Sequence, residues 1–153
     1  SWHPFYVPAF VEDPAALDGL LRLPDVQEVI QAWAHIDTAL VGIGHFASQH
    51  QSSMLFYNYI GKAALQGLEQ CRAVGDICGH FFDAQGHQCF EERRVIGIPL
   101  ESLKALREVI GVAGATDKAP AILGALRGGY IDVLVTDSVA AKTVLDLDRS
   151  GVV

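Results

Sequence analysis

Apolar runs alternate with helical patterns over the second half of the chain. Short runs rich in Val and Ile occupy residues 95–98, 109–113 and 131–135. The first is followed by a segment of helical periodicity at 100–106, and the second by one that ends at Gly128 and Gly129. Nearly uninterrupted apolar strands that alternate with helices are typical of a parallel sheet with helices on both faces. We therefore predict an α/β fold built on a mostly parallel sheet.

Caps and turn residues indicate the remaining elements. Asp13 and Pro14 form an N-cap and first-turn pair that starts a helix running to about Leu23, and Pro24 starts a second helix. We further expect, in order, a strand at 37–44, an irregular loop at 45–59, a helix at 62–71, a hairpin at 74–90 that turns at 83–86, and a helix at 137–147. No repeat or linker divides the chain, so a single domain is predicted.

The loop at 114–120 joins a predicted buried strand to a helix, and parallel sheets bind ligands at such strand ends. A helix start offers free backbone N–H groups and the positive end of the helix dipole, and Lys118 adds a mobile cation. Gly114 permits close approach of the backbone to a ligand. This combination suits a phosphate, a carboxylate or a sugar hydroxyl. The alternative is that Thr116 or Asp117 only caps the helix while Lys118 is solvated.

Three other positions are candidates for ligand contact. Gly42 and Gly44 end a second predicted strand, but they lack the full G-x-G-x-x-G pattern, so a dinucleotide site is not expected. They serve either ligand contact or tight packing of the strand against a helix. Asp76 stands in an apolar strand, where its carboxylate could accept hydrogen bonds from sugar hydroxyls or could satisfy backbone donors in a turn.

The three cysteines, Cys71, Cys78 and Cys89, are an odd number without the spacing of a disulfide framework, so reduced thiols are expected. If Phe82 pairs with His87 across the hairpin, four side chains share one face and could bind zinc. That set comprises Cys78, His80, His87 and Cys89. A shift of one residue would scatter it, and Cys is often only a small core residue. We expect no metal or cofactor.

Composition narrows the function classes. The formal charge of −7, without a cluster of Lys and Arg, argues against an intrinsic nucleic-acid surface. The chain is 50% hydrophobic and 19% charged, which predicts a buried sheet and surface covered by another segment or subunit, and hence a homo-oligomer. Residues 38–61 carry no charge, but their polar side chains argue against a membrane span. No signal-peptide pattern is visible, so a cytoplasmic protein is expected.

Five ordered stretches resemble one family. Residues 74–86 resemble the strand-and-turn signature of the sugar-binding domain in SorC-type bacterial transcriptional regulators. Its later motifs are matched in order by 94–98, 112–122 and 126–137, and 41–44 fits an earlier one. The resemblance implies a Rossmann-like α/β domain with one β-hairpin, similar to ribose-phosphate and glucosamine-phosphate isomerases. It also implies a sensor of a phosphorylated sugar that adjusts how a separate helix-turn-helix region engages DNA, without catalysis.

The resemblance also implies roles for single residues. By motif match, Asp76 would contact sugar hydroxyls, Lys118 the sugar or its phosphate, and Gly42 and Gly44 would line the pocket. The family's helix-turn-helix and the first part of its effector domain have no counterpart here. Residues 1–153 are therefore expected to be one effector domain without its N-terminal part. Phe56 stands where family members often carry a basic residue.

Two other functions remain open from the sequence. The isomerase-like fold also hosts enzymes, and a sugar-phosphate isomerase would need a general base, for which Asp76 is the one candidate. A purely structural or oligomerisation fragment without a ligand is the other reading. The serines form no G-x-S-x-G nucleophile elbow, so a hydrolase of that type is not expected.

Overall fold

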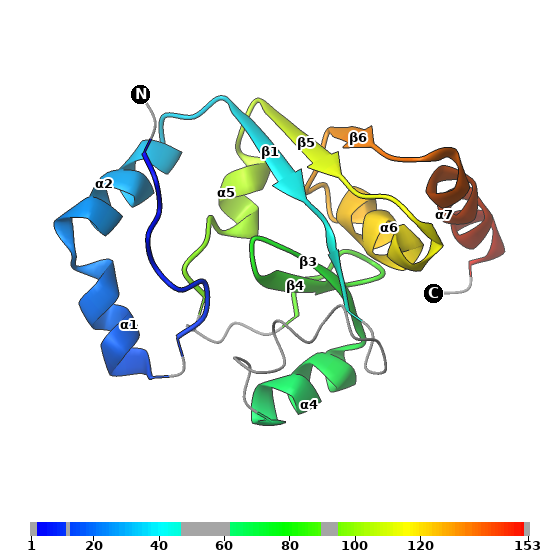
Figure 1. Ribbon diagram of the computed structural model, residues 1–153. Helices are drawn as coiled ribbons and strands as arrows, with labels where there is room; N and C mark the ends of the chain where they lie inside the picture. Colours follow the sequence, from blue (N-terminus) through cyan, green and yellow to red (C-terminus); the bar gives the residue numbers. More distant parts are fainter. Residues whose placement is uncertain (1–2, 12, 47–61, 90–94, 152–153) are drawn as a thin grey trace.

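Figure 1 shows the computed structural model of the chain, which describes residues 3–11, 13–46, 62–89 and 95–151. Two three-stranded sheets lie at its centre. In chain order the described elements are α1 (Pro14–Leu21), α2 (Pro24–Trp33), β1 (Thr38–Gly42), β2 (Gly44–His45), α4 (Lys62–Cys71), β3 (Ala73–Ile77), β4 (His80–Asp83), α5 (Leu100–Lys104), β5 (Glu108–Val112), the 3-10 turn η2 (Thr116–Lys118), α6 (Ala119–Arg127), β6 (Val133–Val135) and α7 (Ser138–Ser150).

The first sheet is parallel, with the strand order β1-β5-β6. Its inner face is formed by side chains such as Val41 and Val109, which are buried. They belong to the main core together with Leu103 of α5, Ile122 of α6 and Val144 of α7. The predicted α/β fold with a mostly parallel sheet is confirmed, and helices cover this inner face.

The other side of the parallel sheet, called here the outer face, differs sharply. Its side chains are Leu40, Ile110, Val112, Val133 and Val135, and the register places Leu40 beside Ile110 and Ile110 beside Val133. Leu40 is 74% exposed, and the three valines are exposed as well. The expected helical cover is therefore absent from the outer face in the part of the chain that the structure describes.

The second sheet is antiparallel, with the order β2-β3-β4. Phe82 of β4 belongs to the main core with α6, whereas the preceding residue, Phe81, packs with Leu68 of α4 in a smaller core. Since successive side chains of a strand point to opposite faces, helices bury this sheet from both sides. Asp76 of β3 pairs with Phe81, so its side chain shares the α4 face.

Local signals explain the elements that agree with the sequence. The Asp13 side chain accepts a hydrogen bond from the Ala15 N–H at 2.9 Å and caps α1, as predicted. The Asp137 side chain caps α7 in the same way, bonding to the N–H groups of Val139 and Ala140. The helices predicted at 62–71 and 100–106 are present as α4 and α5.

Two predicted strands are wrong. Residues 95–98 do not join the parallel sheet; only Val95 makes an isolated bridge, with Phe10, because the extended N-terminal segment takes the place of a sheet neighbour. The continuous strand expected at 74–82 is divided into β3 and β4 by a tight turn at Cys78 and Gly79, whose φ angles are 53° and 84°.

No helix in the described ranges is long and apolar enough to cross a membrane. Most of the irregular loop expected at 45–59, including Phe56, lies outside the described residues.

Candidate functional site

Asp76 is the buried acid of the candidate site. Its side chain is in β3, only 7% of the residue is exposed, and it is the one buried polar or charged residue in the described part of the chain. One carboxylate oxygen, Oδ2, accepts a hydrogen bond from the Gly79 N–H at 3.1 Å. Burial raises the pKa of this carboxyl, while the Gly79 hydrogen bond and the positive charge of Lys118 oppose the shift.

Gly44 leaves room for this carboxylate. The register of the antiparallel sheet places Gly44 of β2 directly beside Asp76. A Cβ atom at position 44 would overlap Oδ1 of Asp76, so only glycine fits while the carboxylate keeps its place. The requirement for glycine here comes from the close approach of a side chain on the neighbouring strand, and not from the packing of a strand against a helix that was one of the two expected roles.

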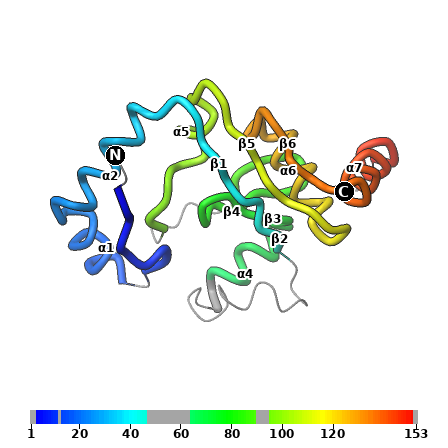
Figure 2. Tube along the Cα trace, turned by 45° about the horizontal axis from the view of Figure 1, so that its top comes forward, coloured from blue at the N-terminus to red at the C-terminus, as the bar shows by residue number. Residues whose placement is uncertain are grey.

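Lys118 reaches the same place from the other sheet. It is the last residue of η2, which follows β5, and its Nζ donates a hydrogen bond to the carbonyl oxygen of Ile43 at 2.9 Å. Ile43 is the residue between β1 and β2, and β2 lies beside β3 (Figure 2). The ammonium and the Asp76 carboxylate therefore converge on the short segment Ile43–Gly44.

Gly114 is held by a different partner. A Cβ atom there would lie 2.6 Å from Oδ2 of Asp137, and the same oxygen accepts a hydrogen bond from the Ala115 N–H at 2.6 Å. Ala115 has a φ of 76°, an unfavourable backbone conformation for a residue with a side chain. Hydrogen bonds from the N–H groups of Ala140 and Ala115 hold the pKa of Asp137 below its ordinary value. One carboxylate thus fixes the loop that leads to Lys118.

Gly42 stands apart from this group. It pairs with Val112 on the outer face, and a Cβ atom there would meet nothing within 4 Å. It directly precedes Ile43 in the chain. Of the five candidates, the structure therefore brings Gly44, Asp76 and Lys118 together, holds Gly114 one step away, and leaves Gly42 open.

His45 and Asp117 are residues of this region that the sequence analysis did not assign to the site. The His45 side chain is only 6% exposed, and its Nε2 lies 3.8 Å from Oδ2 of Asp117. Each is the immediate neighbour of a candidate, Gly44 or Lys118. This contact ties β2 to η2, and the bond from Lys118 to Ile43 ties η2 to the residue before β2. The only available signal was adjacency in the sequence, which does not reveal that His45 and Asp117 meet.

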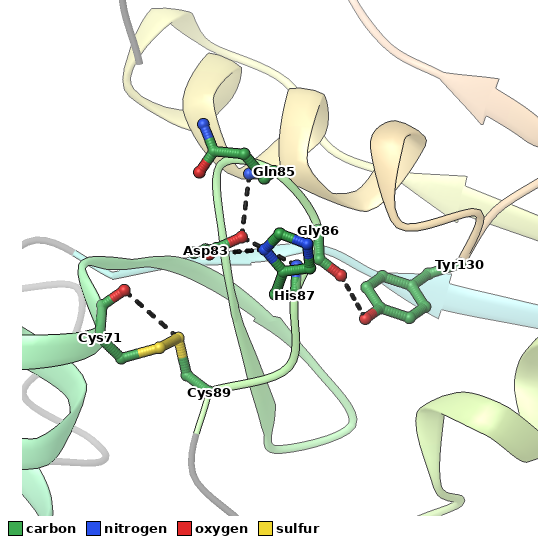
Figure 3. The surroundings of a disulfide bond; sticks show 7 residues. All are labelled: Cys71, Asp83, Gln85, Gly86, His87, Cys89 and Tyr130. Carbon is green, nitrogen blue, oxygen red and sulfur yellow. Dashed lines mark hydrogen bonds and ion pairs between the residues drawn. A yellow bond between two sulfur atoms is a disulfide. The ribbon is translucent and has the colours of Figure 1, made fainter.

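The candidate zinc set is not assembled. Phe82 bridges Gln88 rather than His87, which is the one-residue shift that scatters the four side chains. Cys89 instead forms a disulfide with Cys71 (Figure 3), so the expectation of three reduced thiols is wrong. The described residues contain no group of three or more potential metal ligands.

The arrangement at Ile43–Gly44 is suited to a polar, uncharged or anionic ligand. A buried carboxylate supplies acceptors for hydroxyl groups, and an ammonium supplies donors and positive charge for a phosphate.

Comparisons with known proteins identify the family of the chain. Residues 1–146 match a family model described as "putative sugar-binding domain". The transcriptional regulator LsrR of Escherichia coli O139:H28 is 40% identical over 123 residues, which is 78% of this chain and 39% of that protein. The chain therefore spans about two fifths of the length of that relative.

Solved structures of transcriptional regulators also resemble this chain. A transcriptional regulator from Streptococcus pneumoniae superposes with a TM-score of 0.86 at 28% identity, covering 95% of this chain and 55% of the other. The full-length sorbitol operon regulator SorC from Klebsiella pneumoniae gives a TM-score of 0.79 at 31% identity, covering 90% and 43%. The fold is thus that of the sugar-binding domains of bacterial regulators. The chain belongs to the sugar-binding domain family found in SorC-type transcriptional regulators.

Proposed function

We propose that this chain is the effector-binding part of a sugar-responsive transcriptional regulator, and that it takes a phosphorylated sugar at the junction of its two sheets. The observation that carries the proposal is the convergence of Lys118 and Asp76 on Ile43–Gly44. A sugar phosphate offers both hydroxyl groups and an anion, and the two side chains offer one partner for each.

Each residue has a defined role in the proposal. The Asp76 carboxylate accepts hydrogen bonds from sugar hydroxyls, and Lys118 exchanges its bond to the Ile43 carbonyl for one to the phosphate. Gly44 lines the pocket beside Asp76, Gly42 forms its edge next to Ile43, and Gly114 lets the loop approach the ligand. Because the carboxylate is already desolvated and the ammonium already placed, little further ordering is required when the ligand binds.

Regulation follows from a difference in affinity. A sugar can shift the protein between two arrangements only if it binds one of them more tightly. We propose that the arrangements differ in subunit packing within a cytoplasmic homo-oligomer, and that a helix-turn-helix region outside this chain engages DNA. The apolar outer face supports an assembly that buries it, since parallel sheets are ordinarily covered on both faces.

Titration with sugar phosphates tests the site. We expect at least one pentose or hexose phosphate to raise the melting temperature, and the matching unphosphorylated sugar to do so much less. Lys118→Met should weaken binding by about 10- to 100-fold, because a charge-assisted hydrogen bond is lost, and Asp76→Asn by about tenfold.

Two exposed residues provide matched controls. Lys142→Met removes a cation from α7, and Asp18→Asn removes an acid from α1, so neither should change the affinity. If no sugar phosphate raises the melting temperature, or if Lys118→Met binds as tightly as the unmodified chain, the proposed site is wrong.

A further inference from the structure

The Cys71–Cys89 disulfide joins two segments that flank the Asp76 strand. Cys71 is the last residue of α4, and Cys89 lies 18 residues further along the chain, after the hairpin turn (Figure 3). Their Cα atoms are 5.8 Å apart. Cys89 is 1% exposed, in the small core that also holds Leu68 and Phe81. The bond therefore fastens α4 to the face of the antiparallel sheet on which Asp76 lies.

A disulfide is unusual in the compartment where a regulator of DNA must work. Cytosolic thiols keep most cysteines reduced, and the disulfides that do form there are usually catalytic or redox-sensing. We infer that Cys71–Cys89 is a reversible redox tie, opened by cytosolic thiols such as glutathione and closed by glutathione disulfide, which sets how firmly the Asp76 strand is held. This inference rests on the proposed function only through the cytosolic location.

The surroundings accommodate both states of the pair. The Sγ atom of Cys89 lies 3.7 Å from the carbonyl oxygen of Cys71, within reach for the S–H of a reduced Cys89 to donate a hydrogen bond (Figure 3). Reduction therefore leaves no orphaned polar group beside the apolar core. Cys71, in contrast, is only half-buried, and the proposal takes its sulfur as the one that a small thiol or disulfide attacks.

This difference in exposure gives the order of the chemistry. On oxidation, the Cys71 thiolate attacks glutathione disulfide, forms a mixed disulfide and releases one glutathione thiolate. The Cys89 thiol then loses its proton, attacks the Cys71 sulfur and releases the second glutathione. Two protein thiols and one glutathione disulfide thus become one protein disulfide and two glutathione molecules. Reduction runs through the same mixed disulfide in reverse.

The two ends of the tie are not equally anchored. On the Cys89 side, the Tyr130 hydroxyl donates to the Gly86 carbonyl at 2.6 Å, and Asp83 accepts from the N–H groups of Gln85 and His87 (Figure 3). These bonds hold the hairpin turn whether or not the disulfide is present. On the other side, α4 leads directly through Arg72, with a φ of 57°, into β3. Reduction therefore loosens the junction of α4 and β3, five residues from Asp76.

The experiment needs no sugar, so its failure is distinct from failure of the proposed site. Oxidised and reduced chain are compared by hydrogen exchange, and the cysteines are trapped by alkylation over a series of glutathione to glutathione-disulfide ratios. We expect Cys71 and Cys89 to titrate together within the cytosolic range of ratios. Amides of β3 should exchange about tenfold faster after reduction, while those of β5 stay unchanged.

Variants separate the pair from the third cysteine. The double variant Cys71→Ser, Cys89→Ser should show the hydrogen-exchange pattern of the reduced chain under all conditions. Its melting temperature should be roughly 10 °C below that of the oxidised, unmodified chain. Cys78→Ser, which removes the free thiol, should behave as the unmodified chain. The inference is overturned if the pair stays oxidised, or never oxidises, over the cytosolic ratios. Equal exchange of β3 in both states would also overturn it.

Discussion

The two sheets of this domain are of equal size and opposite design. The parallel sheet has one buried face and one exposed apolar face, whereas the antiparallel sheet is enclosed by α6 on one side and α4 on the other. The parallel sheet supplies the cation, Lys118, from the loop after β5. The antiparallel sheet supplies the acid, Asp76, from within a strand. The candidate site lies where the chain passes from one sheet to the other, at Ile43.

This difference shows how a buried charge can be tolerated. A carboxylate among apolar side chains is costly unless donors reach it, and the enclosed sheet provides one through the turn at Gly79. The open sheet contributes a flexible side chain that needs no burial. The antiparallel sheet thus bears the cost of the buried carboxylate, and three substitutions test how the two sheets differ.

The largest expected effect comes from the shared core of the antiparallel sheet. Phe82 is fully buried, with its ring centroid 5.4 Å from that of Tyr130, so Phe82→Ala should lower the free energy of unfolding by about 3–5 kcal/mol. Leu40→Ala on the outer face should change it by less than about 0.5 kcal/mol. Urea titrations of both variants provide the measurement. A large loss for Leu40→Ala would show that the outer face is covered in solution.

The second largest effect concerns a hydrogen bond between Tyr130 and the antiparallel hairpin. Tyr130 lies between α6 and β6, and its hydroxyl donates to the carbonyl of Gly86 in the antiparallel hairpin. Tyr130→Phe leaves that buried carbonyl unpaired and should lower the free energy of unfolding by about 1–3 kcal/mol. Tyr6→Phe, at an exposed tyrosine, is the matched control and should have no measurable effect. Equal stability of the two variants would show that the hydrogen bond from Tyr130 to Gly86 does not stabilise the fold.

The smallest expected effect is an increase in stability, caused by the substitution Asp76→Asn. The pKa of Asp76 is raised above 3.8 by burial, so the folded state binds this proton more tightly than the unfolded state does. Stability is therefore lost as the pH rises from about 4 through the raised pKa. Asp76→Asn removes that loss and should raise the melting temperature at pH 7, with the difference disappearing below pH 4. Thermal melts at several pH values check this, and a lower melting temperature at pH 7 would contradict it.

Local chemistry was sufficient to predict the helices but not the partners of the strands. Asp13 and Asp137 cap helices through bonds made within four residues, which a sequence pattern can reveal. The segment 95–98 has the composition of a strand, yet its neighbour is the distant segment around Phe10. Hydrophobic runs indicate that a strand is possible, not what it pairs with.

The same limit applies to the site. Asp76 and Lys118 were candidates from the residue pattern as well as from the family resemblance, and their convergence depends on the path of the chain at Ile43. The contact between His45 and Asp117 and the Cys71–Cys89 disulfide were missed because both join segments that are remote in sequence. In the hairpin, a shift of one residue in register decided between a metal set and a disulfide.

The aligned apolar side chains of the outer face affect how mutational data on this domain should be interpreted. Leu40, Ile110 and Val133 lie side by side across three strands. In a scan of the isolated chain, charged substitutions there would score as harmless or even as improving solubility. In any assembly that buries this face, the same substitutions would rank among the most damaging. The two rankings, compared position by position, would make these side chains a direct reporter of assembly.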